Sequence, residues 1–379
     1  MNAAQDTIAK NAKPMTNLIK HIGITITSSV LMISCSTYID DGEVAKLPSS
    51  FNGVENLIDS IELIALEQPD GQYLGGMVEL ACSNDNWFVV DKPNCHIHRY
   101  SKNGKFLNTI GHKGNSSKEF LTIQNVQILD TLCMVHSIPD KINYYTLDGR
   151  FHKGEIQQHL LGDCSVLSHD GILSYMVYKP ELKHILRFES KDGNISKFLK
   201  TENYVLNLMT GEPVFYNHGD YISIIDSYSD IVYSFNGQDV LPLAYFDFGS
   251  YRIPAEFYRY SDVYQGASFL LNSKFARICR FMGNSDTFFA EVALQDGADA
   301  KFVYAIKRDA GWKWYDTGNG YELLSGTFRL FDGENFVAII EPCKLCNLPD
   351  SVRNKIINAD ILNSINENDN YVVAKIRLR

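Results

Sequence analysis

Three residues with side chains suited to chemistry occupy the same position after short apolar runs. Asp91, His136 and Asp226 follow the runs Trp87–Val90, Leu132–Val135 and Tyr221–Ile225, which end 45 and then 90 residues apart. Carboxylates and an imidazole around one opening could bind a divalent cation or a polar ligand, and such a set would serve metal-assisted hydrolysis or elimination. The competing interpretation is turn capping, because Asp at a strand end often accepts hydrogen bonds from local amides.

Two further groups contain possible metal ligands. In Cys95-His-Ile-His98, strand alternation places His96 and His98 on one face, but no third ligand can be assigned; the alternative is a polar, exposed strand face. Cys343 and Cys346 form the one Cys-x-x-Cys pair, without the second pair that structural zinc needs or a thioredoxin-like βαβ context. We therefore interpret them as loop or packing cysteines, with a local disulfide or a metal site as alternatives.

Motifs of common enzyme classes are absent from the sequence. It contains no Gly-x-Ser-x-Gly elbow, no His-Glu-x-x-His zinc motif and no phosphate-binding Walker loop. The sequence therefore favours a binding module over an enzyme and assigns no catalytic residue. A divalent cation is the one cofactor that the residues leave open.

A repeated unit must position these residues. The segment Tyr100-Ser-Lys-Asn-Gly-Lys-Phe106 is echoed by Tyr145-Thr-Leu-Asp-Gly-Arg-Phe151, and weaker copies follow. Their glycines stand at positions 104, 149, 193 and 237, which gives steps of 45, 44 and 44. Because Asn-Gly and Asp-Gly suit tight hairpins with positive φ, we expect type I′ turns between short strands.

The period identifies the fold class. A repeat near 45 residues with about four short strands is typical of propeller blades, whose sheets bury their faces by stacking radially. Counting units from residue 67 to 379 predicts an all-β, six-bladed β-propeller with short helical insertions. One helical insertion is expected within 251–276, and an amphipathic helix packed on the last blade is expected over Leu348–Ile365.

Several segments resemble a known family. The clearest are Ile58-Asp-Ser-Ile-Glu-Leu-Ile-Ala-Leu-Glu67, the Asp91–Gly114 region and Asn366–Asn370 before a final strand. They are similar to the six-bladed β-propeller lipoproteins of Bacteroidetes, which are related in fold to NHL-type propellers. In such propellers the N-terminal strand often completes the last blade. We therefore expect Ile61–Leu66 to pair in one sheet with Tyr371–Leu378, which removes an exposed edge.

The N-terminal region predicts export. Residues 1–34 have the layout of a signal peptide, with Met15 as an alternative start, and the apolar run Ile22–Ile33 is too short to span a membrane. Leu31-Met-Ile-Ser-Cys35 resembles a bacterial lipobox, which implies that Cys35 is lipidated and anchors the protein in the outer membrane. The acidic residues that follow resemble a surface-export tag of Bacteroidetes. We assign 35–54 to a flexible tether and 55–379 to the propeller.

Net charge limits the partners. The chain carries a formal charge of −10, and the +2 balance of residues 1–34 leaves −12 on the remainder, which disfavours nucleic acid. The first hypothesis is a membrane-anchored, surface-exposed propeller lipoprotein that binds a glycan, peptide or protein. The alternative is a metal-assisted hydrolase or lyase at the propeller channel, with Asp91, His136 and Asp226 around it.

Overall fold

The computed structural model describes residues 44–68, 74–76, 78–137, 141–156, 164–176, 183–200, 214–226, 228–260, 262–297, 299–308, 311–318 and 320–379. The chain divides into two compact units, Met1–Ile39 and Asp40–Arg379, and every described residue belongs to the second. The predicted signal peptide and Cys35 therefore lie outside the described residues. No helix of the described ranges is long and apolar enough to cross a membrane.

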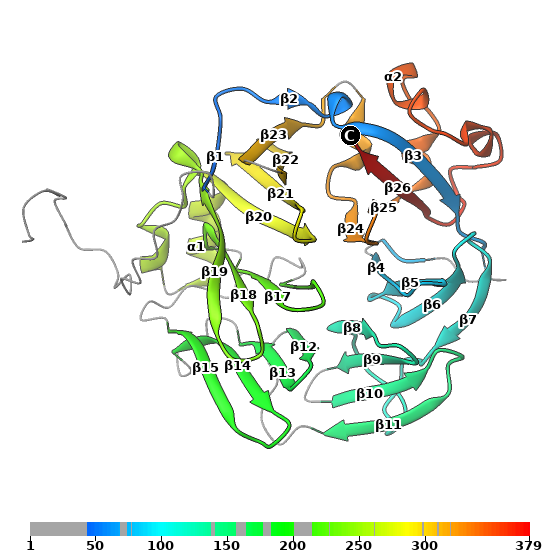
Figure 1. The fold of residues 1–379 in the computed structure, drawn as a ribbon, viewed down its shortest axis with the longest axis vertical. Helices are drawn as coiled ribbons and strands as arrows, with labels where there is room; N and C mark the ends of the chain where they lie inside the picture. Colours follow the sequence, from blue (N-terminus) through cyan, green and yellow to red (C-terminus); the bar gives the residue numbers. More distant parts are fainter. Residues whose placement is uncertain are drawn as a thin grey trace, which may run out of the picture. The chain divides into compact units, whose positions relative to one another are not determined.

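Six sheets, each forming one blade, are arranged around a common centre (Figure 1). In chain order, blades 1 to 3 contain β4–β7 (Val78–Cys82, Asn86–Asp91, His96–Ser101, Phe106–Ile110), β8–β11 (Asn125–Ile128, Leu132–Ser137, Lys141–Thr146, Phe151–Ile156) and β12–β15 (Cys164–Ser168, Gly171–Tyr175, His184–Ser190, Ile195–Lys200). Blades 4 to 6 contain β16–β19 (Phe215–Asn217, Ile222–Ile225, Ile231–Phe235, Val240–Asp247), β20–β23 (Lys274–Gly283, Thr287–Asp296, Asp299–Arg308, Gly311–Asp316) and β24–β26 (Phe328–Phe331, Phe336–Ile340, Val372–Leu378). The predicted six-bladed, all-β fold is confirmed.

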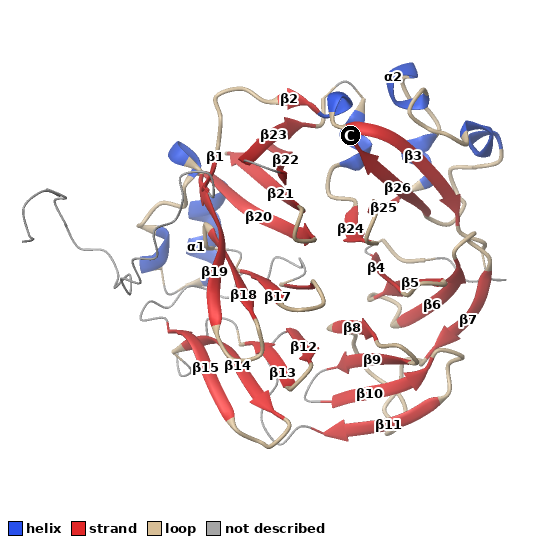
Figure 2. Cartoon of the chain, in the orientation of Figure 1, coloured by secondary structure: helices blue, strands red, loops and turns tan. Residues whose placement is uncertain are grey.

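Adjacent blades pack through apolar side chains. Blades 6 and 1, for example, share a buried cluster that includes Trp87, Tyr100 and Val337. Near the centre, β4 contacts β8 and β24, while β20 contacts β17 and β24. Figure 2 shows that the helices are short segments attached to a framework of strands. Burial between sheets thus provides the cohesion that no single four-stranded sheet could supply.

The ring closes as predicted. Strand β3 (Ile58–Ala65) pairs antiparallel with β26, with Ile61 opposite Ile376 and Ile64 opposite Val373. The outer edge of β3 is covered by the chain after β25, because the Asn358 amide accepts a hydrogen bond from Leu63 N–H and donates one to Leu63 O. The closing blade therefore exposes little unpaired backbone along this edge.

The helix expected over Leu348–Ile365 is a misprediction. The segment forms only one helical turn, α2 (Asp350–Arg353), and a 3₁₀ segment, η7 (Ala359–Asn363). Between them, Ile61 donates its N–H to Lys355 O and accepts a hydrogen bond from Ile357 N–H. A continuous helix would use those groups internally, so pairing with β3 overrides the helical pattern. Val352 and Ile356 still pack on blade 6.

The insertion within 251–276 is helical, as predicted. It contains two 3₁₀ turns, η3 (Gly249–Tyr251) and η4 (Phe257–Arg259), and the helix α1 (Val263–Leu271). Asp262 caps α1 by accepting a hydrogen bond from Gln265 N–H at 2.9 Å. Buried Tyr228, Phe257, Leu270 and Phe275 fix the insertion to the ring.

Two short strands lie within residues 35–54, which the sequence assigned to a flexible tether. β1 (Val44–Lys46) pairs in parallel with β19, and β2 (Asn52–Gly53) pairs in parallel with β23. Ala45 and the 3₁₀ segment η2 (Val54–Asn56) contribute buried side chains. Residues 44–54 thus belong to the propeller, because exposed edge strands of blades 4 and 5 offer them backbone partners.

The repeated turns differ in type from the prediction. Gly104 has φ of +88° and Gly149 has φ of +92°, but the residues before them have negative φ. Gly104 N–H donates to Ser101 O at 2.9 Å, and Ser101 N–H donates to Lys105 O at 2.9 Å. This is a type I turn followed by a glycine bulge, not a type I′ turn, and it explains why the glycine itself recurs.

Candidate functional site

The three residues selected from the sequence do occupy equivalent strands. Asp91 ends β5, His136 lies in β9 and Asp226 directly follows β17, and each of these is the second strand of its blade. Their common position in the sequence repeat therefore predicts correctly which strand of a blade each residue belongs to. The three residues nevertheless belong to blades 1, 2 and 4, and among the described residues no three His, Cys, Asp or Glu side chains are grouped to hold a metal.

Asp91 is a turn cap. Its carboxylate accepts hydrogen bonds from Asn94 N–H at 3.0 Å, from the Asn94 amide at 2.9 Å and from Gly75 N–H at 2.6 Å. These bonds hold the β5–β6 turn and secure the segment that precedes β4. This is the turn-capping role considered above.

Asp226 and His136 are enclosed by the packed blades. Asp226 accepts a hydrogen bond from the Tyr175 hydroxyl at 3.2 Å, which links blade 3 to blade 4. His136 is fully buried in β9, opposite Asn125 on one side and Ile142 on the other. Asp226 thus takes part in a contact between two adjacent blades, and His136 in the packing of its own blade.

The His96–His98 pair shares one side of β6, with ring centroids 5.4 Å apart. His98 is nevertheless buried, and a ring nitrogen lies 3.1 Å from Thr109 Oγ1. Burial, with a smaller contribution from His96, lowers the His98 pKa to about 4. The interpretation of an exposed strand face is therefore wrong for His98, which is a neutral core histidine at pH 7.

Cys343 and Cys346 lie in and just after the 3₁₀ segment η6 (Pro342–Leu345) and are both free thiols. Cys346 Sγ lies 3.5 Å from Pro342 O, and Cys343 is exposed. This agrees with loop cysteines.

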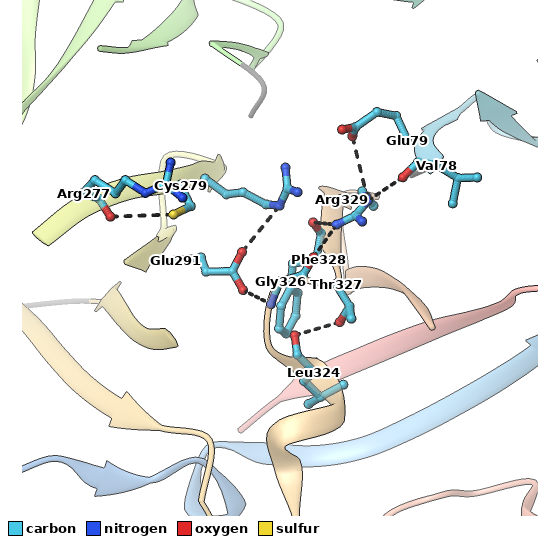
Figure 3. A network of polar contacts seen from close by, with 11 residues as sticks. Val78, Glu79, Arg277, Cys279, Glu291, Leu324, Gly326, Thr327, Phe328 and Arg329 are labelled. Atoms are coloured by element: carbon cyan, nitrogen blue, oxygen red, sulfur yellow. Dashed lines mark hydrogen bonds and ion pairs between the residues drawn. The ribbon is translucent and has the colours of Figure 1, made fainter. Parts of the chain in front are cut away.

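The structure gathers a different set of charged side chains near the centre of the ring. Glu79 on β4, Arg280 on β20 and Arg329 on β24 come from the inner strands of blades 1, 5 and 6, and Glu291 comes from the neighbouring β21. Figure 3 shows Glu79, Glu291 and Arg329 converging from these separate strands. We call these four residues the inner charge cluster.

β-Bulges place both arginines. The β20–β21 register shifts between Ile278 and Arg280, and the β24–β25 register shifts between Phe328 and Leu330. In the described residues of blades 1 to 4, the pairing of the first two strands is regular. Ile278 and Phe281 both enter one apolar cluster although they are three residues apart, which requires the extra residue. The bulge thereby turns Arg280 away from that cluster and towards Glu291.

The Arg329 guanidinium donates several hydrogen bonds to backbone carbonyl oxygens. Its Nε donates to Val78 O at 3.0 Å, and its Nη1 donates to Gly326 O at 2.8 Å and Phe328 O at 2.9 Å. Glu79 Oε2 lies 3.8 Å from Nε. Burial, and to a lesser degree the positive charge of Arg280, lower the Arg329 pKa. Arg329 therefore acts as a staple that joins blade 6 to blade 1.

The Arg280 guanidinium has N–H groups that no acceptor of the described chain satisfies. Its Nε lies 3.5 Å from Glu291 Oε2, and only 9% of its side chain and 1% of that of Glu291 are exposed. Glu291 Oε1 accepts a hydrogen bond from Gly326 N–H at 2.8 Å, so the carboxylate is fixed. Arg280 Nε and Nη1 are both buried, and neither forms a hydrogen bond with the described chain. A buried guanidinium donor of this kind is costly unless an acceptor completes it.

The cluster is suited to binding. A guanidinium remains charged at all physiological pH values and presents donors in a fixed plane that matches a carboxylate or carbonyl oxygen. Sequence reasoning missed Arg280 and Arg329, although each interrupts a short apolar run, Ile278-Cys-Arg-Phe-Met282 for Arg280 and Phe328-Arg-Leu-Phe331 for Arg329. A charged residue within an apolar run was therefore the feature of the sequence that could have identified these arginines.

The closed ring of six sheets defines the chain as a six-bladed β-propeller. Within that class the chain belongs to the DUF4934 family, a domain of unknown function whose model matches residues 48–377. The predicted membership of a propeller family of Bacteroidetes is confirmed.

Two solved structures from Bacteroides are similar in fold. A protein of Bacteroides fragilis NCTC 9343 that is named as exported has a TM-score of 0.70 at 16% identity, over 89% of this chain and 99% of that one. A member of the DUF4221 family from Bacteroides vulgatus ATCC 8482 has a TM-score of 0.54 at 11% identity, over 85% of this chain and 98% of that one. At these identities the likeness concerns the fold alone. A search of curated proteins found no match.

Proposed function

We propose that the protein is a lipid-anchored binding module of the bacterial cell envelope, displayed on the outer membrane. Its inner charge cluster receives an oxygen acceptor of a glycan, peptide or protein ligand. The observation that carries this proposal is the buried Nη1 of Arg280, which lacks an acceptor in the described chain although Glu291 holds the side chain in place. A ligand oxygen would complete this donor.

The location rests on the N-terminal pattern. Residues 1–34 have the layout of a signal peptide, and Cys35 follows the lipobox-like segment. The similar protein of Bacteroides fragilis is named as exported, which supports the same address here. Several acyl chains on one cysteine would hold the propeller on a membrane without a spanning helix.

The binding function is tested with glycan, peptide and envelope-protein arrays probed with residues 36–379. The matched variant is Arg280→Met/Glu291→Gln, which removes both charges together and so leaves no uncompensated buried ion. We expect the wild type to bind a ligand class that the double variant loses. Absence of binding by the wild type across all three arrays, or equal binding by both proteins, contradicts the proposal.

The anchor is tested separately in cells. Cys35→Ala should move the protein from the membrane fraction to the soluble fraction, because the acyl chains provide the attachment. Protease added to intact cells should degrade the wild-type protein if it is displayed on the surface. A Cys35→Ala protein that stays in the membrane fraction contradicts lipidation.

A further inference from the structure

A groove of about 990 Å³ lies between blades 6 and 1. It is lined by parts of β3 and β26, by the β4–β5 turn and by the Lys102–Asn103 turn. Cys82 and Asp332, which line it, lie at the far ends of β4 and β24 from Val78 and Arg329. The groove is therefore distinct from the inner charge cluster.

Trp87 and Lys102 form the most unusual contact of this groove. The Lys102 ammonium lies 3.4 Å from the centroid of the Trp87 ring, and the indole N–H donates to Lys102 O at 3.2 Å. Only 1% of Trp87 is exposed, so Lys102 covers a ring face that would otherwise border the groove. The contact pairs a movable cation with a rigid aromatic surface.

The Lys102 ammonium lines the groove and forms no ion pair with a carboxylate of the described residues. Lys375 is paired with Glu62 at 3.2 Å. Asp332 Oδ1 accepts hydrogen bonds from Asn335 N–H at 2.7 Å and Glu334 N–H at 3.1 Å, so its carboxylate is committed to its own turn. Burial lowers the Lys102 pKa, with a smaller contribution from Lys375, and the negative charges of Asp332 and Asp85 oppose this effect in part.

The remaining lining is suited to hydroxyl groups. The groove wall includes Ser83, Asn84 and Ser364, whose side chains both donate and accept hydrogen bonds. The groove thus offers amide and hydroxyl groups, an aromatic face and a cation without an ion-pair partner. These three features match the three surfaces of an acidic sugar. Those surfaces are its hydroxyls, the apolar C–H face of its ring and its carboxylate. A carboxylate-rich peptide would use the cation but not the aromatic face.

We propose that this groove binds an acidic oligosaccharide. The sugar carboxylate pairs with the Lys102 ammonium and draws it off the Trp87 ring, and the C–H face of the pyranose then packs against the indole. The volume of about 990 Å³ is at the upper end of the usual range for small-molecule sites and accommodates a short oligomer. This site is additional to the one at the inner charge cluster.

Tryptophan fluorescence tests the proposal, because moving a cation off Trp87 changes its emission. Purified residues 36–379 are titrated with trigalacturonic acid, with maltotriose as an uncharged sugar and with triglutamate as an acidic peptide. We expect a saturable change with trigalacturonic acid alone. No saturable change with this probe, an equal response to maltotriose, or an equal response to triglutamate overturns the proposal.

Two lysine variants identify the residue responsible. Lys102→Met keeps the length of the side chain but removes its charge, and should weaken trigalacturonic acid binding about tenfold or more, the loss expected for one charge-assisted hydrogen bond. Lys301→Met is the matched control, because Lys301 lies 4.5 Å from the Phe51 ring centroid, outside the groove lining. Isothermal calorimetry measures both, with melting curves to verify folding. Equal affinity of Lys102→Met and wild type contradicts the assignment.

The two sites can fail independently. Arg280→Met/Glu291→Gln should leave trigalacturonic acid binding unchanged, because the inner charge cluster shares no residue with the groove lining. Loss of array ligands without loss of this binding separates the two proposals, and a parallel loss of both contradicts the existence of a separate groove site.

Discussion

Arg329 and Arg280 stand at β-bulges in the inner strands of adjacent blades, yet they have opposite relations to their surroundings. Arg329 donates to three backbone carbonyls and joins blade 6 to blade 1. Arg280 has one fixed carboxylate beside it and a buried donor without an acceptor in the described chain. The same residue type in the same structural device therefore serves as a staple in one blade and as an open donor in the next.

The difference follows from where each bulge falls. Arg329 is itself the residue left out of the β24–β25 pairing, so free carbonyls of its own chain segment surround it. Arg280 stands after the unpaired residue Cys279 and is itself paired opposite Glu291, so the group beside its guanidinium is that carboxylate and not a backbone carbonyl. Hydrogen bonds offset the desolvation cost of a buried charge, whereas an unfilled donor marks a place where a ligand can compensate.

Glu291→Ala should have the largest effect on this comparison. It leaves Arg280 buried without its carboxylate and Gly326 N–H without its acceptor, so we expect a loss of about 3–5 kcal/mol in the free energy of unfolding. Urea denaturation measures it. Glu291→Gln is the control, because its oxygen can still accept from Gly326 N–H. A loss below about 1 kcal/mol for Glu291→Ala would show that the pair is not truly buried.

Acid should act through histidines and not through the arginines. Burial lowers the pKa of His98 and of His218, which lies in the turn between β16 and β17, to about 4, below the unfolded value of 6.5. Each contribution is therefore complete above pH 6.5 and is lost as the pH falls towards 4, by up to roughly 3 kcal/mol per histidine. Denaturation at several pH values should show this decline, and His98→Gln should flatten it. An equally steep decline in that variant excludes His98 as a source.

Arg329→Met should cost about 2–3 kcal/mol, because it leaves several buried carbonyls without donors. Arg329→Lys should recover little of this loss, since an ammonium cannot reproduce the planar fork that reaches three carbonyls. Thermal denaturation compares the two variants. Full recovery by lysine would mean that charge alone, and not the geometry of the staple, holds the two blades together.

The smallest effect is expected for Arg280→Met/Glu291→Gln. Replacing a buried ion pair with uncharged groups of similar volume is often neutral or stabilising, so we expect a change within about 1 kcal/mol. Differential scanning calorimetry measures it. A loss comparable to that of Arg329→Met would show that Arg280 is also a structural staple and would remove the basis of the comparison.

Much of the fold could be predicted because it depends on local pattern and on length. The glycines from Gly104 to Gly237 mark the blades, and the pairing of β3 with β26 follows from an apolar strand at each end of the ring. The helix expected over Leu348–Ile365 failed because Ile356 and Asn358 find backbone partners on β3, which a local pattern cannot reveal.

The candidate site was less predictable. Asp91, His136 and Asp226 occupy the same position of the sequence repeat. This places them at equivalent points of different blades but does not give the distance between them. The inner charge cluster depends on register instead. One extra residue before Arg280 decides which neighbouring blade its side chain faces.

The amino-acid sequence alone therefore determined the repeat, the number of blades and the strands that close the ring, because each rests on periodic burial and on turns built from neighbouring residues. Only the tertiary structure decided which charged side chains meet. Bulges and inter-blade packing bring Glu79, Arg280, Glu291 and Arg329 together from strands that are up to 250 residues apart, and no local pattern records such a meeting.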